Sequence, residues 1–354
     1  MYPQYWGLGN VDWQQRINWE EVRKKRLDRA HKFMAKYGIG SALVYHHDRQ
    51  RYLTSLINHP YAFQTPKRPM LLIRDNGFPY IPVDRALDFR VVHEDAPWLA
   101  GKVLGEDELS LPMPCRYDTA EHAKGQWSKA ARQIKALLKK HGVADMPISI
   151  DYCTPYLFHA LEAEGLKVVD GNAWIDECGM VKFDEEILCM KMAASIQEAG
   201  YGALVRDFRI GMNEEQAYAI MVKAVLEQGG EYFEGRGMRS GDRTSPRRFT
   251  WGDRKIRPGE FITVEIIHVR YCGYMLCYDR SFYVGTKPTE IQKEIYQTAV
   301  EMQDRFGALL KPGITTHDLA KLRPKPGQNF TTPEQIRKYR AEWSNHYGGV
   351  GIAW

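Results

Sequence analysis

The stretch 259–285, GEFITVEIIHVRYCGYMLCYDRSFYVG, constrains the fold of this chain more than any other part of it. It predicts two strands joined by a turn at 272–273, because aliphatic, aromatic and β-branched residues dominate both flanks of a Cys-Gly pair. Side chains alternate between the two faces of a strand, so Glu265 is expected on the face opposite the aliphatic one. In the second strand Cys277 and Asp279 share a face. Two carboxylates and a thiol are therefore expected to converge between these strands.

Length, charge and cysteine usage limit the class of protein. At 354 residues the chain exceeds one ordinary core, so we expect two domains, 1–172 and 173–354. The 49 basic residues exceed the 44 acidic ones by only five, spread along the chain, which argues against a nucleic-acid partner. No apolar run approaches the roughly 18 residues of a membrane span. The six cysteines form no CxxC pair, so a cytoplasmic protein without a membrane partner is expected.

The first half alternates helical and extended patterns, which predicts an α/β layer structure. Residues 1–17 are expected to form an extended arm. The expected helices are 18–37, 121–140 and 154–164, and the expected strands are 41–46, 52–54, 70–74, 89–94, 148–151 and a short one near 168.

The second half follows a segment, 170–185, that we expect to cross between the domains. Its pattern predicts helices at 185–208, 213–226, 288–310, 316–322 and 333–342. A long loop is expected at 234–258, before the 259–285 hairpin.

Several runs of the second half resemble the creatinase/prolidase superfamily. They are VKFDEEILCMKMAASIQEAG (181–200), GMNEEQAYAIM (211–221), RPGEFITVEI (257–266), GYMLCYDRSFYVG (273–285), LKPGITTHDLA (310–320) and HYGGVGIAW (346–354). The resemblance implies an α/β N-terminal creatinase-like domain, an α+β pita-bread C-terminal domain and a homodimer. The run GGEYFEGRGMRSGDRTSP (229–246) is similar to the dimethylsulfoniopropionate lyases of this fold.

The metal-binding members of this family hold two divalent ions with two hairpin aspartates, a histidine from a glycine-rich turn and two later glutamates. Those positions fall here on Glu265, its neighbour Ile267, Cys277 and Gly348, and the two glutamates would lie past Trp354. The resemblance therefore implies no cofactor, with a divalent metal possible only if other donors complete the set.

Two explanations remain open for the stop at Trp354. We favour a fragment, because the resemblance implies roughly another 70 residues to complete the C-terminal domain. The alternative is a complete product whose sheet has an exposed edge.

The expected catalytic residues are Glu265, Asp279 and His346. A carboxylate on the pocket face acts as a base or nucleophile without metal when its environment favours the task. His346 matches the first histidine of the family's HxxH-type turn, a position that lines the substrate site. The alternatives are structural: an ion pair of Glu265 with an arginine of the 236–257 loop, and an Asp279–Arg280 pair that holds the hairpin.

Two further groups are expected to bind substrate. Arg239, Arg243 and Arg247 are suited to clamping a carboxylate, because guanidinium groups bind carboxylates in bidentate fashion. Aromatic rings attract a quaternary ammonium or sulfonium head, and the aromatic candidates are Tyr232, Trp251 and Tyr271. Solvated loop charge and ordinary packing are the alternative interpretations.

The sequence thus predicts an enzyme that cleaves a small zwitterionic metabolite, by C–N hydrolysis or by C–S elimination, without a dinuclear metal site. A Xaa-Pro peptidase-like metallohydrolase is one alternative. A non-catalytic pseudo-enzyme that retains binding is the other.

Overall fold

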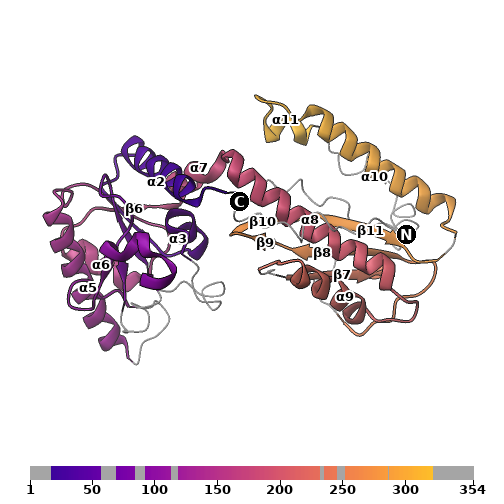
Figure 1. Cartoon of the computed structure of the whole chain (residues 1–354), viewed down its shortest axis with the longest axis horizontal. Coiled ribbons are helices and arrows are strands. Elements are labelled where there is room, and N and C mark those ends of the chain that lie inside the picture. Colours follow the sequence, from indigo (N-terminus) through magenta and orange to yellow (C-terminus); the bar gives the residue numbers. More distant parts are fainter. Residues whose placement is uncertain are drawn as a thin grey trace. The chain divides into compact units, whose positions relative to one another are not determined.

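The computed structural model describes residues 17–56, 69–83, 92–112, 119–231, 235–244, 252–285 and 287–321 (Figure 1). These residues form two compact units that divide between Glu185 and Glu186, later in the chain than the expected boundary at 172. The expected arm before Ile17 and the expected helix 333–342 lie outside the described residues. In the described part no helix is long and apolar enough to cross a membrane.

The first unit is built on a four-stranded sheet with the order β2-β1-β5-β6. Its strands are β1 (Ser41–Val44), β2 (Met70–Ile73), β5 (Ile148–Ile150) and β6 (Val168–Asp170). Strands β1, β5 and β6 run parallel, and β2 pairs antiparallel with β1. A separate parallel pair joins β3 (Ile81–Pro82) to β4 (Val103–Leu104).

Helices cover both faces of the four-stranded sheet, which explains why its strands are apolar at nearly every position. They are α2 (Trp19–Lys36), α3 (His47–Thr54), α5 (Ala120–Lys140), α6 (Pro155–Ala163) and α7 (Asn172–Met180), with the 3-10 helix η3 (Pro97–Lys102) nearby in the chain. Leu43 packs with Trp127 of α5, whereas Val44, pointing the other way, packs with Met34 of α2 and Trp174 of α7. The predicted α/β layer structure is confirmed.

Two strands expected in this unit were wrong, and one expected connecting segment contains a helix. The expected strand 52–54 is the end of α3, because Leu53 is buried against the sheet from a helix that ends at Ser55 with φ 58°. The expected crossing segment 170–185 contains α7, which is anchored by the buried Trp174. Residues 92–94 of the expected strand 89–94 are helical, and residues 89–91 lie outside the described residues.

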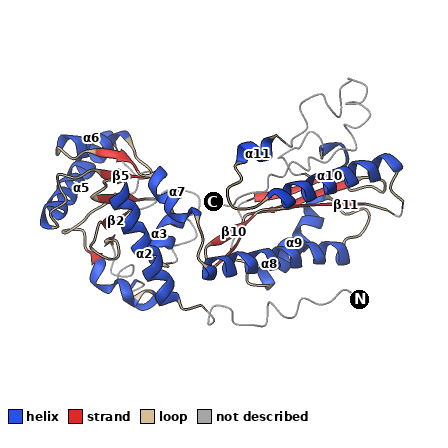
Figure 2. Ribbon diagram, turned by 90° about the horizontal axis from the view of Figure 1, so that it is seen from above, coloured by secondary structure: helices blue, strands red, loops and turns tan. Residues whose placement is uncertain are grey.

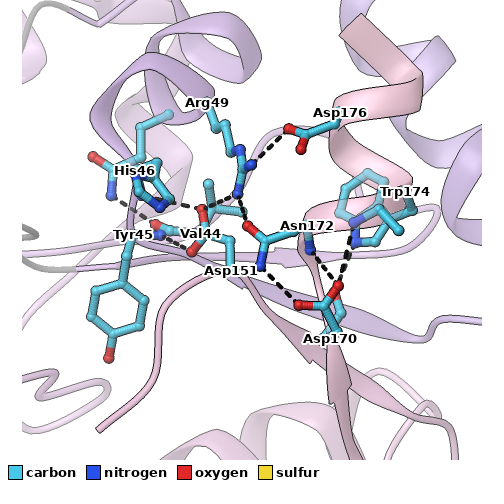
Figure 3. Close-up of polar contacts among 12 residues, drawn as sticks. Val44, Tyr45, His46, Arg49, Asp151, Asp170, Asn172, Trp174 and Asp176 are labelled. Atoms are coloured by element: carbon cyan, nitrogen blue, oxygen red, sulfur yellow. Dashed lines mark hydrogen bonds and ion pairs between the residues drawn. The ribbon is translucent and has the colours of Figure 1, made fainter. Parts of the chain in front are cut away.

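A polar network joins the carboxyl ends of the parallel strands (Figure 3). Asp151, directly after β5, accepts hydrogen bonds from the backbone N–H groups of Tyr45 (2.7 Å) and His46 (3.2 Å) beyond β1. The guanidinium of Arg49 lies 3.3 Å from Asp151 and donates to Asn172 (2.7 Å) at the start of α7. The buried carboxylate thus fixes the loop after β1 to the end of β5.

The imidazole of His31 binds the turn after β2 through both ring nitrogens, which fixes the tautomer of the ring. Its Nδ1 accepts the backbone N–H of Asp75 (3.1 Å), so Nε2 carries the proton and donates to the carbonyl of Gly77 (3.1 Å). Burial lowers the pKa of His31, against the opposing effect of the Gly77 hydrogen bond. The proton that converts the neutral imidazole to a cation is therefore bound more tightly in the unfolded chain than in the folded one.

We expect this histidine to make stability depend on pH. Its contribution is present above the ordinary histidine pKa of 6.5 and is lost as pH falls toward the lower pKa of the folded state. Between about pH 8 and about pH 5.5, the free energy of unfolding measured with urea should fall less for His31→Gln than for the unchanged protein. His159→Gln, at an exposed position of α6, is the matched control. An equal decrease in the free energy of unfolding for His31→Gln and for the unchanged protein would contradict this role of His31.

The second unit contains a three-stranded antiparallel sheet with the order β11-β8-β7. Its strands are β7 (Gly235–Ser240), β8 (Phe261–Ile267) and β11 (Asp279–Tyr283), and a separate pair consists of β9 (Val269–Tyr271) and β10 (Tyr274–Leu276). The predicted turn at 272–273 is confirmed, with φ 51° at Cys272 and 83° at Gly273. Glu231 accepts both of their N–H groups at 3.1 Å.

Helices of the second unit are α8 (Asp184–Asp207), α9 (Glu214–Glu227), α10 (Glu290–Leu309) and α11 (Thr316–Ala320), with the 3-10 helix η4 (Gly241–Arg243) after β7. Figure 2 shows α8 and α9 on the same side of the strands. A side chain at Gly200 of α8 would meet Val225 of α9 and Ile266 of β8 at 3.1 and 3.2 Å, so these elements pack closely. The aliphatic face of β8 is therefore turned toward α8 and α9.

Two features of this sheet differ from expectation. Residues 235–240 form β7 instead of part of a loop, because a full ladder to β8 stabilises a segment whose two glycines disfavour a strand. His268 has φ 60° and separates β8 from β9, so the first expected strand of the hairpin is divided into two strands. The face of Glu265 is unaffected, since it lies before this break.

Candidate functional site

Strand β8 is central, and its register defines what surrounds Glu265. Glu265 is the direct partner of Asp279 on β11 and of Gly237 on β7. Side chains directly opposite one another in an antiparallel ladder project from the same face, with Cβ atoms roughly 5 Å apart. The two carboxylates therefore share the face opposite the aliphatic one, as the alternation of the sequence predicts. We call Gly237, Glu265 and Asp279 the acidic row.

The thiol of Cys277 completes this cluster. Its Sγ donates a hydrogen bond to Oε1 of Glu265 over 2.7 Å, across the break between β10 and β11. Glu265 is only 6 % exposed, so this donor acts on a carboxylate that is largely removed from water. A hydrogen bond to a charged acceptor is stronger than a neutral one, and it fixes the orientation of the carboxylate. Glu265 thus accepts the Cys277 thiol and is the ladder partner of Asp279, as the expected convergence requires.

A second row of partners lies two residues along each strand. It consists of Arg239 on β7, Thr263 on β8 and Ser281 on β11, all facing the same way as the acidic row. Arg239 is 1 % exposed and Thr263 is 3 % exposed. We call these three residues the hydroxyl row.

Gly237 makes room between the two rows. A Cβ atom at this position would lie 2.9 Å from the Cβ of Glu265 and 3.4 Å from Nη1 of Arg239. The first distance is shorter than van der Waals contact allows, so any side chain here would displace Glu265. The guanidinium of Arg239 thus extends along β7, over the glycine, toward the acidic row.

The other arginines described around η4 are tied to carboxylates. Nε of Arg243 lies 3.3 Å from Oε2 of Glu214, whose other oxygen accepts the N–H (2.9 Å) and hydroxyl (2.8 Å) of Ser240. Burial raises the pKa of Glu214, and the bonds from Ser240 and the charge of Arg243 oppose that rise. Arg254 donates to Glu260 (2.8 Å) and to the Ser240 hydroxyl (2.7 Å). This network holds the turn after β7.

Of the predicted site residues, the structure brings together Glu265, Asp279 and Arg239. Arg243 lies in the network of Glu214, and Tyr271 is on β9, where it is the partner of Tyr274 on β10. The remaining predicted residues lie outside the described part of the chain: Tyr232, Arg247, Trp251 and His346. Thr263 and Gly237 were missed, because a threonine in a strand signals β-propensity and a glycine signals a loop.

A pair of divalent ions needs several oxygen or nitrogen ligands around a small volume, and the described donors on this face fall short of that number. Ile267 contributes no donor, and the thiol of Cys277 is engaged as a hydrogen-bond donor. In the described ranges no three His, Cys, Asp or Glu side chains form a group suited to a metal ion. The described donors alone do not fit a dinuclear centre.

A parallel α/β unit followed by an antiparallel sheet covered by α8 and α9 defines a two-domain class of protein, and comparison with family models identifies it. The creatinase/prolidase N-terminal domain model matches residues 26–181. The metallopeptidase family M24 model matches residues 188–349. The chain belongs to the creatinase/prolidase superfamily, with a creatinase-like α/β N-terminal domain and an α+β pita-bread domain after it.

Solved structures agree on the fold. The Xaa-Pro dipeptidase of Bacillus anthracis superposes with a TM-score of 0.65 at 19 % identity, covering 89 % of this chain and 78 % of that one. The prolidase of Pyrococcus horikoshii superposes with a TM-score of 0.62 at 18 % identity, with the same coverages of 89 % and 78 %.

Among curated proteins, the dimethylsulfoniopropionate lyase DddP of Roseovarius nubinhibens is 26 % identical over 215 residues, which is 59 % of this chain and 47 % of the relative. The Xaa-Pro dipeptidase of Pyrococcus horikoshii is 26 % identical over 181 residues, 50 % of this chain and 48 % of the relative. The chain thus spans about half the length of these relatives.

Proposed function

We propose that this protein is an enzyme that cleaves a small zwitterionic carboxylate, with Glu265 as the group that accepts a proton. The observation that carries the proposal is the acidic row. A buried glutamate is oriented by the Cys277 thiol, lies opposite Asp279 and is adjacent to a row that contains a buried arginine. The similarity to dimethylsulfoniopropionate lyases favours elimination across a C–S bond over hydrolysis of a C–N bond.

In the elimination, each bond change is balanced within the substrate and Glu265. The carboxylate of Glu265 removes a proton from the carbon next to the substrate carboxylate, and the C–H electron pair becomes the new C=C bond. The C–S pair leaves with sulfur, which turns the sulfonium into a neutral thioether. Glu265 then returns its proton to water. The thiol of Cys277 keeps the carboxylate of Glu265 in one orientation throughout the reaction.

A Xaa-Pro peptidase-like metallohydrolase is the second candidate, and the match to metallopeptidase family M24 favours it. That chemistry requires metal ligands beyond the described donors, so we propose a reaction that does not depend on a dinuclear centre. C–N hydrolysis would use the same glutamate to activate water. A homodimer and a cytoplasmic location complete the proposal, and sedimentation of the purified protein tests the first.

Product analysis separates these candidates. The purified protein is incubated with dimethylsulfoniopropionate, with creatine and with an Ala-Pro dipeptide, and the products are measured by chromatography. We expect acrylate and dimethyl sulfide in equal amounts from the first substrate. Free proline from the dipeptide would support the peptidase instead. A protein that changes none of the three substrates, at substrate concentrations well above ordinary KM values, would contradict the proposal.

A further inference from the structure

The hydroxyl row contains a buried side chain that the proposed chemistry has not yet used. Thr263 is 3 % exposed, and its Oγ1 has no hydrogen-bond partner in the part of the chain that the structure describes. A buried hydroxyl group without a partner destabilises a fold, so such groups are rare unless something else binds them. The hydroxyl projects from the face that carries Glu265, two residues away along β8.

The neighbour of Thr263 across the ladder is suited to bind an anion. Arg239 is its direct partner on β7, and a guanidinium presents several N–H donors in a plane that matches a carboxylate. The Arg239 side chain is 1 % exposed, so little water competes for those donors. Arg243 and Arg254 pair with Glu214 and Glu260 in the network beside η4, outside the hydroxyl row.

We infer that Arg239 and Thr263 form the subsite for the carboxylate of the substrate, with the guanidinium and the threonine hydroxyl donating to its oxygens. This inference rests on the proposed function, because it places the substrate relative to Glu265. It extends that function because the distance between the acidic row and the hydroxyl row limits the length of the substrate.

The spacing favours short substrates. Adjacent rows on one face lie two residues apart along the strand, roughly 6.8 Å. The guanidinium of Arg239 reaches from the hydroxyl row over Gly237, so a carboxylate bound between it and Thr263 places the carbon one bond away beside Glu265. In a sulfonium propionate the acidic C–H is on the carbon attached to the carboxylate. In a Xaa-Pro dipeptide the scissile carbonyl carbon is three bonds from the C-terminal carboxylate carbon, so the dipeptide fits this spacing less well.

Two substitutions test the subsite through their separate effects on KM and on kcat. Thr263→Val keeps the shape of the side chain and removes its hydroxyl, and Arg239→Lys keeps the charge and removes the planar pair of donors. With dimethylsulfoniopropionate as substrate, we expect each to raise KM about tenfold while kcat changes less than about threefold. Thr298→Val, on α10, where the hydroxyl donates to the carbonyl of Glu294, is the control and should leave both constants unchanged. Unchanged KM in both folded subsite variants would overturn the inference.

Binding by the unchanged protein separates this inference from the proposed function. Propionate and propionamide are titrated against it by calorimetry, since they differ in the carboxylate alone. We expect propionate to bind at least tenfold more tightly, and Thr263→Val to reduce that preference. Equal affinities would overturn the subsite even if the protein proves to be a lyase. A clear preference would support the subsite even if no turnover of dimethylsulfoniopropionate is found.

Discussion

Replacing Glu265 with glutamine is expected to lower kcat by about 10²- to 10⁴-fold, because the neutral amide cannot accept the substrate proton. The substitution keeps the length of the side chain, and its carbonyl oxygen still accepts the thiol of Cys277. We therefore expect the urea midpoint of unfolding to change little. The kinetic constants and the unfolding curve are measured on the same preparation.

Two further variants make this result specific. Asp279→Asn tests the carboxylate directly opposite on β11, so its loss of kcat measures how far the acidic row acts as a pair. Glu198→Gln removes a carboxylate that pairs with Arg280 and is 38 % exposed, and it should retain activity. A Glu265→Gln protein with kcat within about threefold of the unchanged protein would eliminate Glu265 as the base.

Replacing Asp151 with alanine is expected to destabilise the first unit by about 3–5 kcal/mol, the range found when one partner of a buried ion pair is removed. The side chain of Asp151 is 2 % exposed, and its loss leaves the N–H groups of Tyr45 and His46 without their acceptor (Figure 3). Among the described residues, Arg49 would retain its contacts with Asn172 and Asp176. Urea unfolding followed by tryptophan fluorescence reports the change, since Trp174 is buried in this unit.

The matched control is Asp176→Ala, which removes a different carboxylate from the same guanidinium. Asp176 is 43 % exposed, and exposed ion pairs contribute about 0–1 kcal/mol. A small effect there together with a large effect at Asp151 would assign the stabilisation to the backbone acceptor. Equal small effects at both positions would contradict the role given to Asp151.

The parts of the fold that the sequence predicts are those fixed by local periodicity. The opposite faces of β8 follow from alternation, the turn at 272–273 follows from its Cys-Gly pair, and the start of α9 follows from Asn213. Tertiary packing overrides local preference where the predictions were wrong. The β-prone end of α3 is helical because Leu53 is buried from a helix, and β7 is extended because β8 pairs with it.

The candidate site shows the same limit. Alternation alone placed Glu265 and Asp279 on polar faces, but it did not give the register between strands. Only the register shows that Gly237 lies beside Glu265 and that Arg239 lies beside Thr263. The role of Thr263 depends on burial and on its hydrogen-bond partners, and neither can be obtained from one strand considered alone.

The central claim is that Glu265 acts without a dinuclear metal centre, and turnover after metal removal tests it most directly. The purified protein is treated with a strong chelator and dialysed, its metal content is measured by mass spectrometry, and its turnover of dimethylsulfoniopropionate is compared with that of untreated protein. We predict the same kcat/KM within about twofold for metal-depleted protein. Activity that disappears with the metal and returns on addition of a divalent cation would contradict the claim.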